Sequence, residues 1–287
     1  MDATTHISDR RLTDALAELQ TDPNDTAAMQ PHSDRLAFTD TEFLLRRETR
    51  GIRFQLEMLK PDLGQAAQGI ENTIVVYGSA RFVAADEAAA LLAAAQTAGD
   101  APAIALAERA VRNARYYELA REFASIVAQH SNRQELANRL YVCTGGGPGI
   151  MEAANRGASE AGALTVGLNI ALPHEQGSNP YITPTLSYKF HYFALRKMHF
   201  MMRAKALVAF PGGFGTMDEL FEVLTLVQTG KAKPVPIVLF GTEFWNSLLN
   251  FQVLVDAGTI AEEDLALFHI TDDPQEAWQR IRDFYQL

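Results

Sequence analysis

The chain has 287 residues, a formal net charge of −10 and an apolar fraction of 47%, values of an ordinary globular protein. The acidic balance argues against nucleic acid as a partner, because binding a phosphate backbone calls for a basic surface. Cys143 is the single cysteine, so no disulfide forms within these residues, and a reducing compartment is favoured. No signal-peptide pattern and no apolar run long enough to cross a bilayer is found, so we expect a cytoplasmic location and no membrane association.

Residues 1–69 are predicted to be an N-terminal extension. Up to about residue 35 the sequence is polar and interrupted by prolines, which predicts irregular, partly mobile structure. Between Thr39 and Leu59 apolar residues recur at helical spacing, with Thr39 or Thr41 as candidate caps. We expect the apolar stripe of this helix to pack on the main domain or on a second subunit.

Residues 70–287 alternate predicted strands with predicted helices. The strands are expected at residues 73–77, 139–143, 163–168, 206–210, 235–240 and 267–271. An Ala-rich segment, broken at 99–102, predicts a helical insertion at about 84–112 followed by a helix that carries Tyr116 and Tyr117. This alternation predicts an α/β fold, a Rossmann-like doubly wound parallel sheet with an N-terminal helical extension.

Two glycine-rich turns each stand between a predicted strand and a predicted helix. The first contains Gly145, Gly146, Gly147 and Gly149, and the second contains Gly212, Gly213, Gly215 and Thr216. Such turns leave backbone N–H groups free to face one anion, and the helix that follows adds the positive end of its dipole. We therefore expect a phosphate-bearing ligand at these turns.

The first turn has neither of two nucleotide-binding fingerprints. The pattern G-x-G-x-x-G, counted from Gly145, requires a glycine where the chain has Ile150, and no Gly-Lys-Ser/Thr follows, as a P-loop requires. Ser79 and Arg81 follow the strand at 73–77 and are further candidates at the same edge of the sheet. A turn or helix cap is an equally good interpretation of Ser79.

The second turn has an alternative interpretation. Thr216 and Glu219 have the spacing of a capping box, which would explain both residues as features of a helix start. A cap does not require three glycines in four positions before it, and this surplus favours ligand binding.

A helix predicted at about 191–204 leads into the strand before the second turn. Tyr192, Arg196, His199 and Arg203 form one polar stripe on it, which can face the same crevice as the turn. A solvated charged face is the alternative. Neither HExxH nor a paired Cys/His spacing occurs, so no metal is expected.

The two turns, with Arg196 upstream of the second, resemble the LOG (Lonely Guy) family, whose signature PGGxGTxxE is matched in full by residues 211–219. The family is Rossmann-like and is often mislabelled as lysine decarboxylase. The resemblance covers about residues 70–287 and is to the longer bacterial branch. It implies hydrolysis of the N-glycosidic bond of a nucleoside 5′-monophosphate, such as AMP or a cytokinin nucleotide, to free base and ribose 5-phosphate.

The resemblance also implies roles for particular residues. Arg196 and Glu219 correspond to the catalytic pair, and the second turn corresponds to the phosphate-binding turn. No cofactor is implied, and a homo-oligomer, at least a dimer, is expected. A pyridoxal-phosphate decarboxylase is not expected, because nothing around Lys197 or Lys205 resembles such a site. A non-catalytic module that senses nucleotides is the alternative function.

Overall fold

The computed structural model describes residues 32–172 and 177–287. The chain forms two compact units, one ending at Leu56 and one from Glu57 to Leu287. The irregular segment expected before about residue 35 lies almost entirely outside the described residues. The division expected between residues 69 and 70 stays a prediction.

The first unit contains α2 (Thr41–Leu45) and the start of α3 (Arg50–Ala67). The single helix expected over residues 39–59 is therefore wrong. Oγ1 of Thr49 lies within hydrogen-bond distance of the carbonyl oxygens of Phe43, Leu44 and Arg46, at the break between the two helices. The cap of α2 is also neither of the expected threonines, since Asp40 accepts hydrogen bonds from the N–H groups of Glu42 and Phe43.

The second unit is built on a seven-stranded sheet in which every pair of neighbouring strands is parallel. The strand order is β4-β3-β2-β1-β5-β6-β7. The strands are β1 (Thr73–Tyr77), β2 (Tyr141–Thr144), β3 (Thr165–Ile170), β4 (Ser187–Phe190), β5 (Ala204–Ala209), β6 (Ile237–Phe240) and β7 (Phe268–Thr271). The predicted parallel α/β fold is confirmed.

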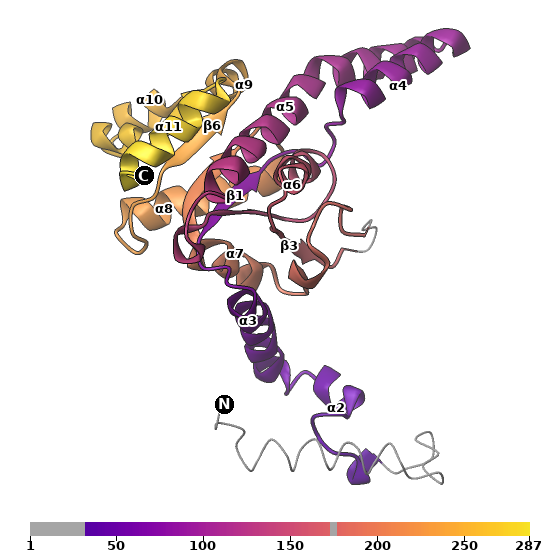
Figure 1. Cartoon of the computed structure of the whole chain (residues 1–287), viewed down its shortest axis with the longest axis vertical. Coiled ribbons are helices and arrows are strands. Elements are labelled where there is room, and N and C mark those ends of the chain that lie inside the picture. The colour runs from indigo at the N-terminus through magenta and orange to yellow at the C-terminus, as the bar shows by residue number, and fades with distance from the viewer. Residues whose placement is uncertain (1–31, 173–176) are drawn as a thin grey trace. The chain divides into compact units, whose positions relative to one another are not determined.

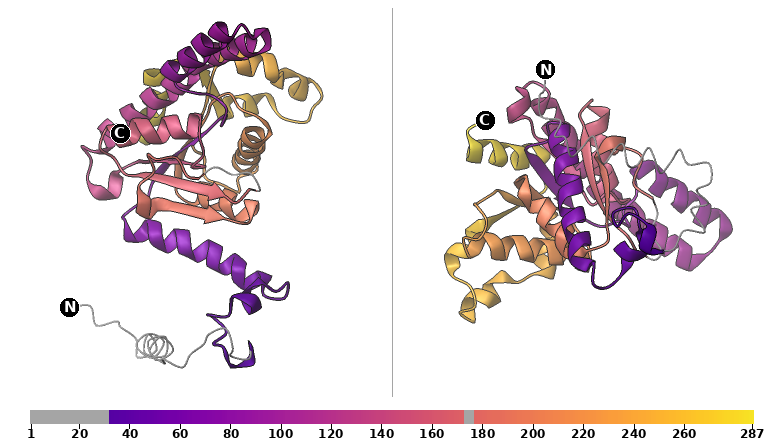
Figure 2. Two further views of the ribbon diagram at one scale, coloured as in Figure 1. Left: turned by 90° about the vertical axis from the view of Figure 1, so that its right-hand side faces the viewer. Right: turned by 90° about the horizontal axis from the view of Figure 1, so that it is seen from below.

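Helices cover both faces of this sheet (Figure 2), as a doubly wound fold requires. Side chains of β1 alternate between two cores: Ile74 and Val76 pack with one set of helices, and Val75 and Tyr77 with the other. The first core includes side chains of α5 (Ala101–Ser131), α6 (Ile150–Glu160) and α11 (Pro274–Tyr285). The second includes side chains of α7 (Phe193–Met202), α8 (Phe214–Gln228) and α9 (Thr242–Leu248). The remaining α-helices in the described part of this unit are the end of α3 from Glu57 onward, α4 (Ala85–Ala98) and α10 (Phe251–Asp256).

The Ala-rich segment forms a hairpin of α4 and α5, with the break where the sequence predicts it (Figure 1). Gly99 ends α4 in the left-handed conformation with φ 67°, and Asp100 caps α5 through the N–H of Ala103. Because α5 continues without interruption to Ser131, the insertion expected to end near residue 112 and the helix expected after it are one helix.

The edge strand β4 is the one strand of the described sheet that the sequence pattern did not predict. It has four residues, of which Tyr188 and Phe190 are buried and Lys189 is exposed. A strand this short carries too few alternations to be distinguished from a loop. It lies next to β3, and the chain then crosses to the other side of β1 to form β5.

Candidate active site

The two glycine-rich turns meet at the point where the strand order reverses. From β1 the chain adds β2, β3 and β4 on one side, and β5 then pairs with the other side of β1. The first turn follows β2 and the second follows β5, so both lie beyond the carboxyl ends of strands that flank β1. In open α/β sheets this is the position at which ligands bind.

Ser79 joins the two turns through its main chain. Its N–H donates to the carbonyl of Pro211 at 3.0 Å, and its carbonyl accepts from the N–H of Ile150 at 3.0 Å. Its hydroxyl accepts from the N–H of Arg81 at 3.1 Å, which is the turn-cap interpretation of this side chain. The residue therefore lies between the turns, and the contacts that hold them together are those of its backbone.

The second turn opens α8 without a side-chain cap. The helix begins at Phe214 with Gly213 as its N-cap. Thr216 therefore lies in the first turn of the helix, so the capping-box interpretation of Thr216 and Glu219 is wrong. The N–H groups of a first turn have no acceptor within the helix, and a Cβ added at Gly213 or Gly215 would meet nothing within 4 Å. The turn thus presents free donors beside open space.

Gly212 has a different reason to be glycine. A Cβ added there would lie 2.2 Å from Oγ1 of Thr216, a side chain that is 6% exposed. The Thr216 side chain therefore packs against the Gly212 backbone and leaves no room for a side chain at position 212.

The first turn requires left-handed backbone at two glycines. Gly146 has φ 73° and Gly149 has φ 72°, a region that residues with a side chain rarely adopt. A Cβ added at Gly149 would also lie 2.3 Å from the carbonyl oxygen of Ser79. The turn therefore fits against the loop after β1 only with glycine at this position.

Buried amide side chains hold the first turn, and the sequence analysis missed them. Asn179 donates through its side chain to the Gly147 carbonyl at 3.1 Å and through its N–H to the Gly146 carbonyl at 2.9 Å. Its side chain also donates to Asn155, whose Oδ1 accepts from the Thr144 hydroxyl at 2.7 Å. These bonds hold the turn's carbonyls on the inner side, and the N–H of Gly146 is also engaged, since it donates to the Thr144 hydroxyl at 2.9 Å. An asparagine inside an Ala-rich apolar helix face, as at position 155, is the signal that could have indicated the network.

Arg196 and Glu219 form an ion pair beside the turns. Nη2 of Arg196 on α7 donates to Oε1 of Glu219 on α8 at 2.9 Å, and both side chains are 11% exposed. The guanidinium also lies over the rings of Phe193 and Phe200. A Cβ added at Gly145 would lie 3.5 Å from Nη1 of Arg196, so the same guanidinium lies beside the first turn.

Two residues of the predicted polar stripe are buried. Arg196 is 9% exposed and His199 is 2% exposed, so the solvated-face interpretation is wrong for both. Nε of Arg196 is buried and has no hydrogen-bond partner within the described chain. The guanidinium therefore retains a donor that its protein neighbours leave unused.

The electrostatics of Glu219 differ from those of an exposed carboxylate. Burial raises the pKa of the Glu219 carboxyl to about 7, although the Arg196 guanidinium beside it acts in the opposite direction. Burial and the negative charge of Glu219 also raise the pKa of Tyr77, at the end of β1, well above its ordinary value. The carboxyl can therefore gain and lose a proton near neutral pH, as a catalytic acid or base must.

Lys197, the lysine next to Arg196, is engaged with two carboxylates. Its Nζ lies 2.7 Å from Asp218 and 2.9 Å from Glu222, both on α8. Burial lowers the pKa of Lys197, but these hydrogen bonds more than offset it and the pKa is raised. The lysine is therefore held as an ammonium ion.

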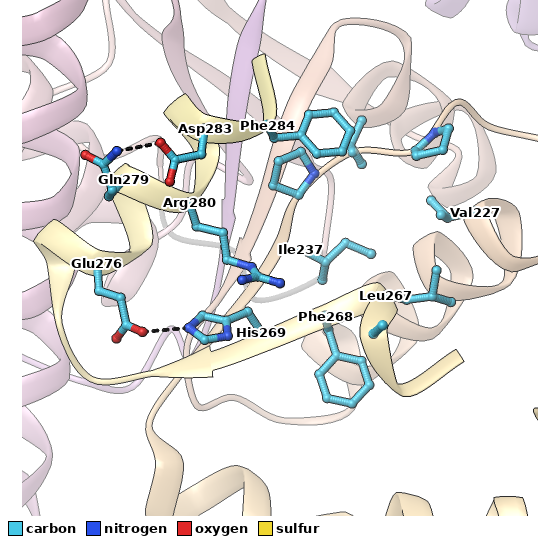
Figure 3. A pocket seen from close by; sticks show the side chains of 14 residues that line it. Val227, Ile237, Leu267, Phe268, His269, Glu276, Gln279, Arg280, Asp283 and Phe284 are labelled. Carbon is cyan, nitrogen blue, oxygen red and sulfur yellow. Dashed lines mark hydrogen bonds and ion pairs between the residues drawn. The ribbon is translucent and has the colours of Figure 1, made fainter. Parts of the chain in front are cut away.

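A cavity of about 520 Å³ lies at the N-terminal ends of β6 and β7, whereas the glycine-rich turns follow the C-terminal ends of their strands (Figure 3). Its walls are largely apolar, with Ile237 and Phe268 among the lining side chains. Its acidic groups have partners, since Glu276 pairs with His269 at 2.9 Å and Asp283 accepts from Gln279. It lies away from the glycine-rich turns and has no part in the candidate site.

Cys143 is buried in β2, and burial raises the pKa of its thiol, so it behaves as a small buried hydrophobe. Within residues 32–172 and 177–287, no group of three or more His, Cys, Asp or Glu side chains could hold a metal ion. Over the same residues no helix has the length and apolar character needed to span a membrane.

Comparisons with known proteins agree with the sequence signature. Residues 151–281 match the family model described as "Possible lysine decarboxylase". The chain is 41% identical over 68 residues to cytokinin riboside 5'-monophosphate phosphoribohydrolase LOG7 of Arabidopsis thaliana, which is 23% of this chain and 31% of that protein. It is 27% identical over 169 residues to cytokinin riboside 5'-monophosphate phosphoribohydrolase LOG5 of Arabidopsis thaliana. That match covers 57% of this chain and 72% of LOG5.

The chain spans less than half of the length of LOG7 and of several further plant relatives. Among solved structures it is similar to the molybdenum cofactor binding protein of the phototrophic bacterium Rippkaea orientalis. That similarity has 14% sequence identity and a TM-score of 0.48, and it covers 75% of this chain and 98% of the other.

Proposed function

The chain belongs to the LOG family, and on that premise we propose that it hydrolyses the N-glycosidic bond of a nucleoside 5′-monophosphate, with AMP or a cytokinin riboside 5′-monophosphate as substrate. The observation that carries the proposal is the buried ion pair of Arg196 and Glu219 between two glycine-rich turns. The plant relatives that the chain resembles are named for this reaction.

The 5′-phosphate binds at the second turn, with the first turn beside it. The free N–H groups at the start of α8 donate to phosphate oxygens, and the helix dipole adds a favourable potential. Gly213 and Gly215 leave the space beside these donors open, so an anion can approach the backbone closely. In this proposal Thr216 completes the turn, and the first turn, with Gly145, Gly146, Gly147 and Gly149, closes the other side.

Glu219 acts on the ribose. Breaking the bond between C1′ and the base nitrogen leaves positive charge on the sugar, as glycoside hydrolysis does. The bond's electron pair leaves with the base, which takes up a proton, and a water oxygen bonds to C1′ after losing its own proton. The ionised Glu219 stabilises the sugar cation and accepts the proton of water. Arg196 orients that carboxylate through its hydrogen bond to Oε1 of Glu219.

Lysine decarboxylation, which the family model's description suggests, is a poorer fit. That chemistry uses a lysine that forms a Schiff base with pyridoxal phosphate, and such a lysine must lose its proton. Lys197 is instead held as an ammonium ion by two carboxylates. Lys205 lies over the ring of Tyr285, at 5.8 Å from its centroid. The environment of Lys197 therefore does not favour a neutral amine.

A homo-oligomer, at least a dimer, is part of the proposal. Large apolar side chains are exposed around the candidate site, at Phe193, Met198 and Met202 of α7 and at Phe214 of the second turn. Phe214 is 95% exposed, which is costly for a phenylalanine in water. A second copy of the chain would cover these side chains. Sedimentation velocity tests this, with a dimer expected for the native chain and a larger monomer fraction for Phe214→Ser.

The rival function is a module that binds a nucleotide without cleaving it. The same turns would serve it, and the two functions separate in one experiment. The protein is titrated with AMP and with a cytokinin riboside monophosphate in a calorimeter, and the same mixtures are then analysed for free base by chromatography. Free base from either nucleotide supports the hydrolase. Binding with no free base supports the sensing module and overturns the proposal.

A further inference from the structure

The helix that carries Arg196 is held at its start by a side chain from α3. Oε1 of Glu57 accepts from the N–H of His191 at 2.9 Å, and Oε2 accepts from the N–H of Tyr192 at 3.1 Å. Tyr192 is the N-cap residue of α7 and makes no side-chain cap hydrogen bond of its own. A carboxylate more than a hundred residues earlier in the sequence thus performs the capping, and it also interacts favourably with the helix dipole.

The path from Glu57 to Arg196 consists of two hydrogen bonds. The carboxylate fixes Tyr192 through its N–H, and the carbonyl of Tyr192 accepts from the N–H of Arg196 at 3.2 Å. Arg196 lies one helical turn after the cap, so a displacement of the cap along the helix axis moves Arg196 with it.

The same stretch of α3 also holds the other end of α7. The carbonyl oxygen of Glu57 lies 3.1 Å from Nε2 of His199, which is buried. Arg203, the C-cap residue of α7, pairs with Asp62 at 2.7 Å and donates to its carbonyl at 3.2 Å. With both ends fixed to residues 57–62, α7 has little freedom to slide along its axis.

We propose that Glu57 is a positioning residue of the active site: its carboxylate sets the axial position of α7, and with it the contact between Arg196 and Glu219. This rests on the proposed function for its kinetic consequence, but the geometric claim does not depend on catalysis. The ion pair has little tolerance for movement, because both side chains are almost enclosed. A misplacement of about 1 Å at such a site can cost roughly 100-fold in rate.

The charges around Glu219 make this movement measurable. The ionisable groups that act on it are Arg196 and Lys197 from α7, Asp218 and Glu222 from its own helix, and Tyr77 from β1. The two cations, which lower the pKa of Glu219, both come from α7. If α7 slides along its axis away from its present position, the carboxylates of α8 and Tyr77 stay in place while Arg196 and Lys197 move away from Glu219, and the pKa of Glu219 rises.

Glu57→Gln tests the proposal, because glutamine keeps the shape but replaces one acceptor oxygen with an NH₂ group that cannot accept from α7. Glu71→Gln is the control, since Glu71 is an exposed carboxylate just before β1. Titration of the Glu219 carboxyl by ¹³C NMR, assigned with Glu219→Gln, is the primary measurement and requires no activity. We expect Glu57→Gln to raise the pKa of Glu219 by about half a unit or more, and Glu71→Gln to leave it unchanged.

Kinetics provide the second readout. In Glu57→Gln we expect kcat to fall by about 10-fold or more while KM changes by less than about threefold, because the phosphate turn is intact. Glu57→Asp keeps the charge but withdraws the carboxylate by one methylene, and it should change both readouts in the same direction by less. An unchanged Glu219 titration in both folded Glu57 variants overturns the proposal. If the native protein cleaves no nucleotide, the proposed function fails, while the titration still decides the role of Glu57.

Discussion

Arg196 donates to Glu219 at 2.9 Å, and its guanidinium lies beside Gly145 of the other glycine-rich turn, where an added Cβ would be 3.5 Å from Nη1. One side chain of α7 therefore lies between the turn after β2 and the helix after β5, and it is hydrogen-bonded to that helix. The link is nearly closed to solvent, so both charges act at close range in a medium that screens them weakly. This relationship determines how the site responds to substitution and to pH.

Replacing Glu219 with glutamine should abolish base release while leaving nucleotide binding measurable. The amide keeps the size of the side chain but can neither accept a proton nor stabilise a sugar cation. We expect kcat to fall by about 100-fold or more, measured by chromatography of free base at saturating AMP. Glu222→Gln, one turn later on α8 and 40% exposed at its side chain, is the matched control. Equal losses in the two variants would show that the effect is not specific to position 219.

Replacing Arg196 with alanine should reduce stability as well as rate, because it leaves a buried carboxylate without its partner. Breaking a buried pair from one side costs about 3 kcal/mol or more in the free energy of unfolding. The double variant Arg196→Ala, Glu219→Gln contains no lone charge, so urea denaturation should show it to be more stable than Arg196→Ala alone. If the second substitution gives no recovery, the pair contributes little to the stability of the fold.

The rate should rise with pH up to neutrality. Since the reaction uses the ionised carboxylate and the pKa of Glu219 is about 7, kcat/KM should increase about tenfold per pH unit below 7 and level off above it. The effect on stability has the opposite sign. The folded pKa is raised above its ordinary value of 4.5, so protonation of Glu219 favours the fold at low pH, and that contribution is lost between about pH 4.5 and 7. A rate profile that is flat from pH 5 to 8 would be inconsistent with this role.

Alanine substitutions at two glycines of the second turn should affect nucleotide binding and folding stability separately. Gly215→Ala places a methyl group in open space within a helix, so the melting temperature should stay the same or rise slightly. The methyl group would, however, occupy the space proposed for the phosphate, and KM for AMP should rise by about tenfold or more. Gly212→Ala, whose Cβ would collide with Thr216, should instead lower the melting temperature. An unaltered KM in Gly215→Ala would show that the phosphate binds elsewhere.

The sequence predicts the parts of the site that local pattern encodes. Strand, glycine-rich turn and helix follow one another within about fifteen residues, so the position of Gly213 at the edge of a parallel sheet can be predicted from spacing alone. The polar stripe on α7 is also visible, but its burial is not. Arg196 is enclosed by Phe193 and Phe200 from its own helix and by the first turn, and a helical pattern cannot distinguish that from a solvated face.

What the sequence does not predict depends on contacts between distant segments. Asn179 reaches the first turn from a loop more than thirty residues later, and Glu57 reaches α7 from a helix that precedes the sheet. Neither residue belongs to a motif, and each is an ordinary polar residue in its own segment. Only the fold brings them to the site, because the order of strands determines which loops meet at one edge.

The most direct test of the account is the product balance from AMP. The native protein is incubated with AMP, and adenine, ribose 5-phosphate, adenosine and inorganic phosphate are each quantified over time. Cleavage at C1′ beside Glu219 predicts adenine and ribose 5-phosphate in equal amounts, with neither adenosine nor phosphate. Release of adenosine and phosphate, or no product from either AMP or a cytokinin riboside monophosphate that binds, would contradict it.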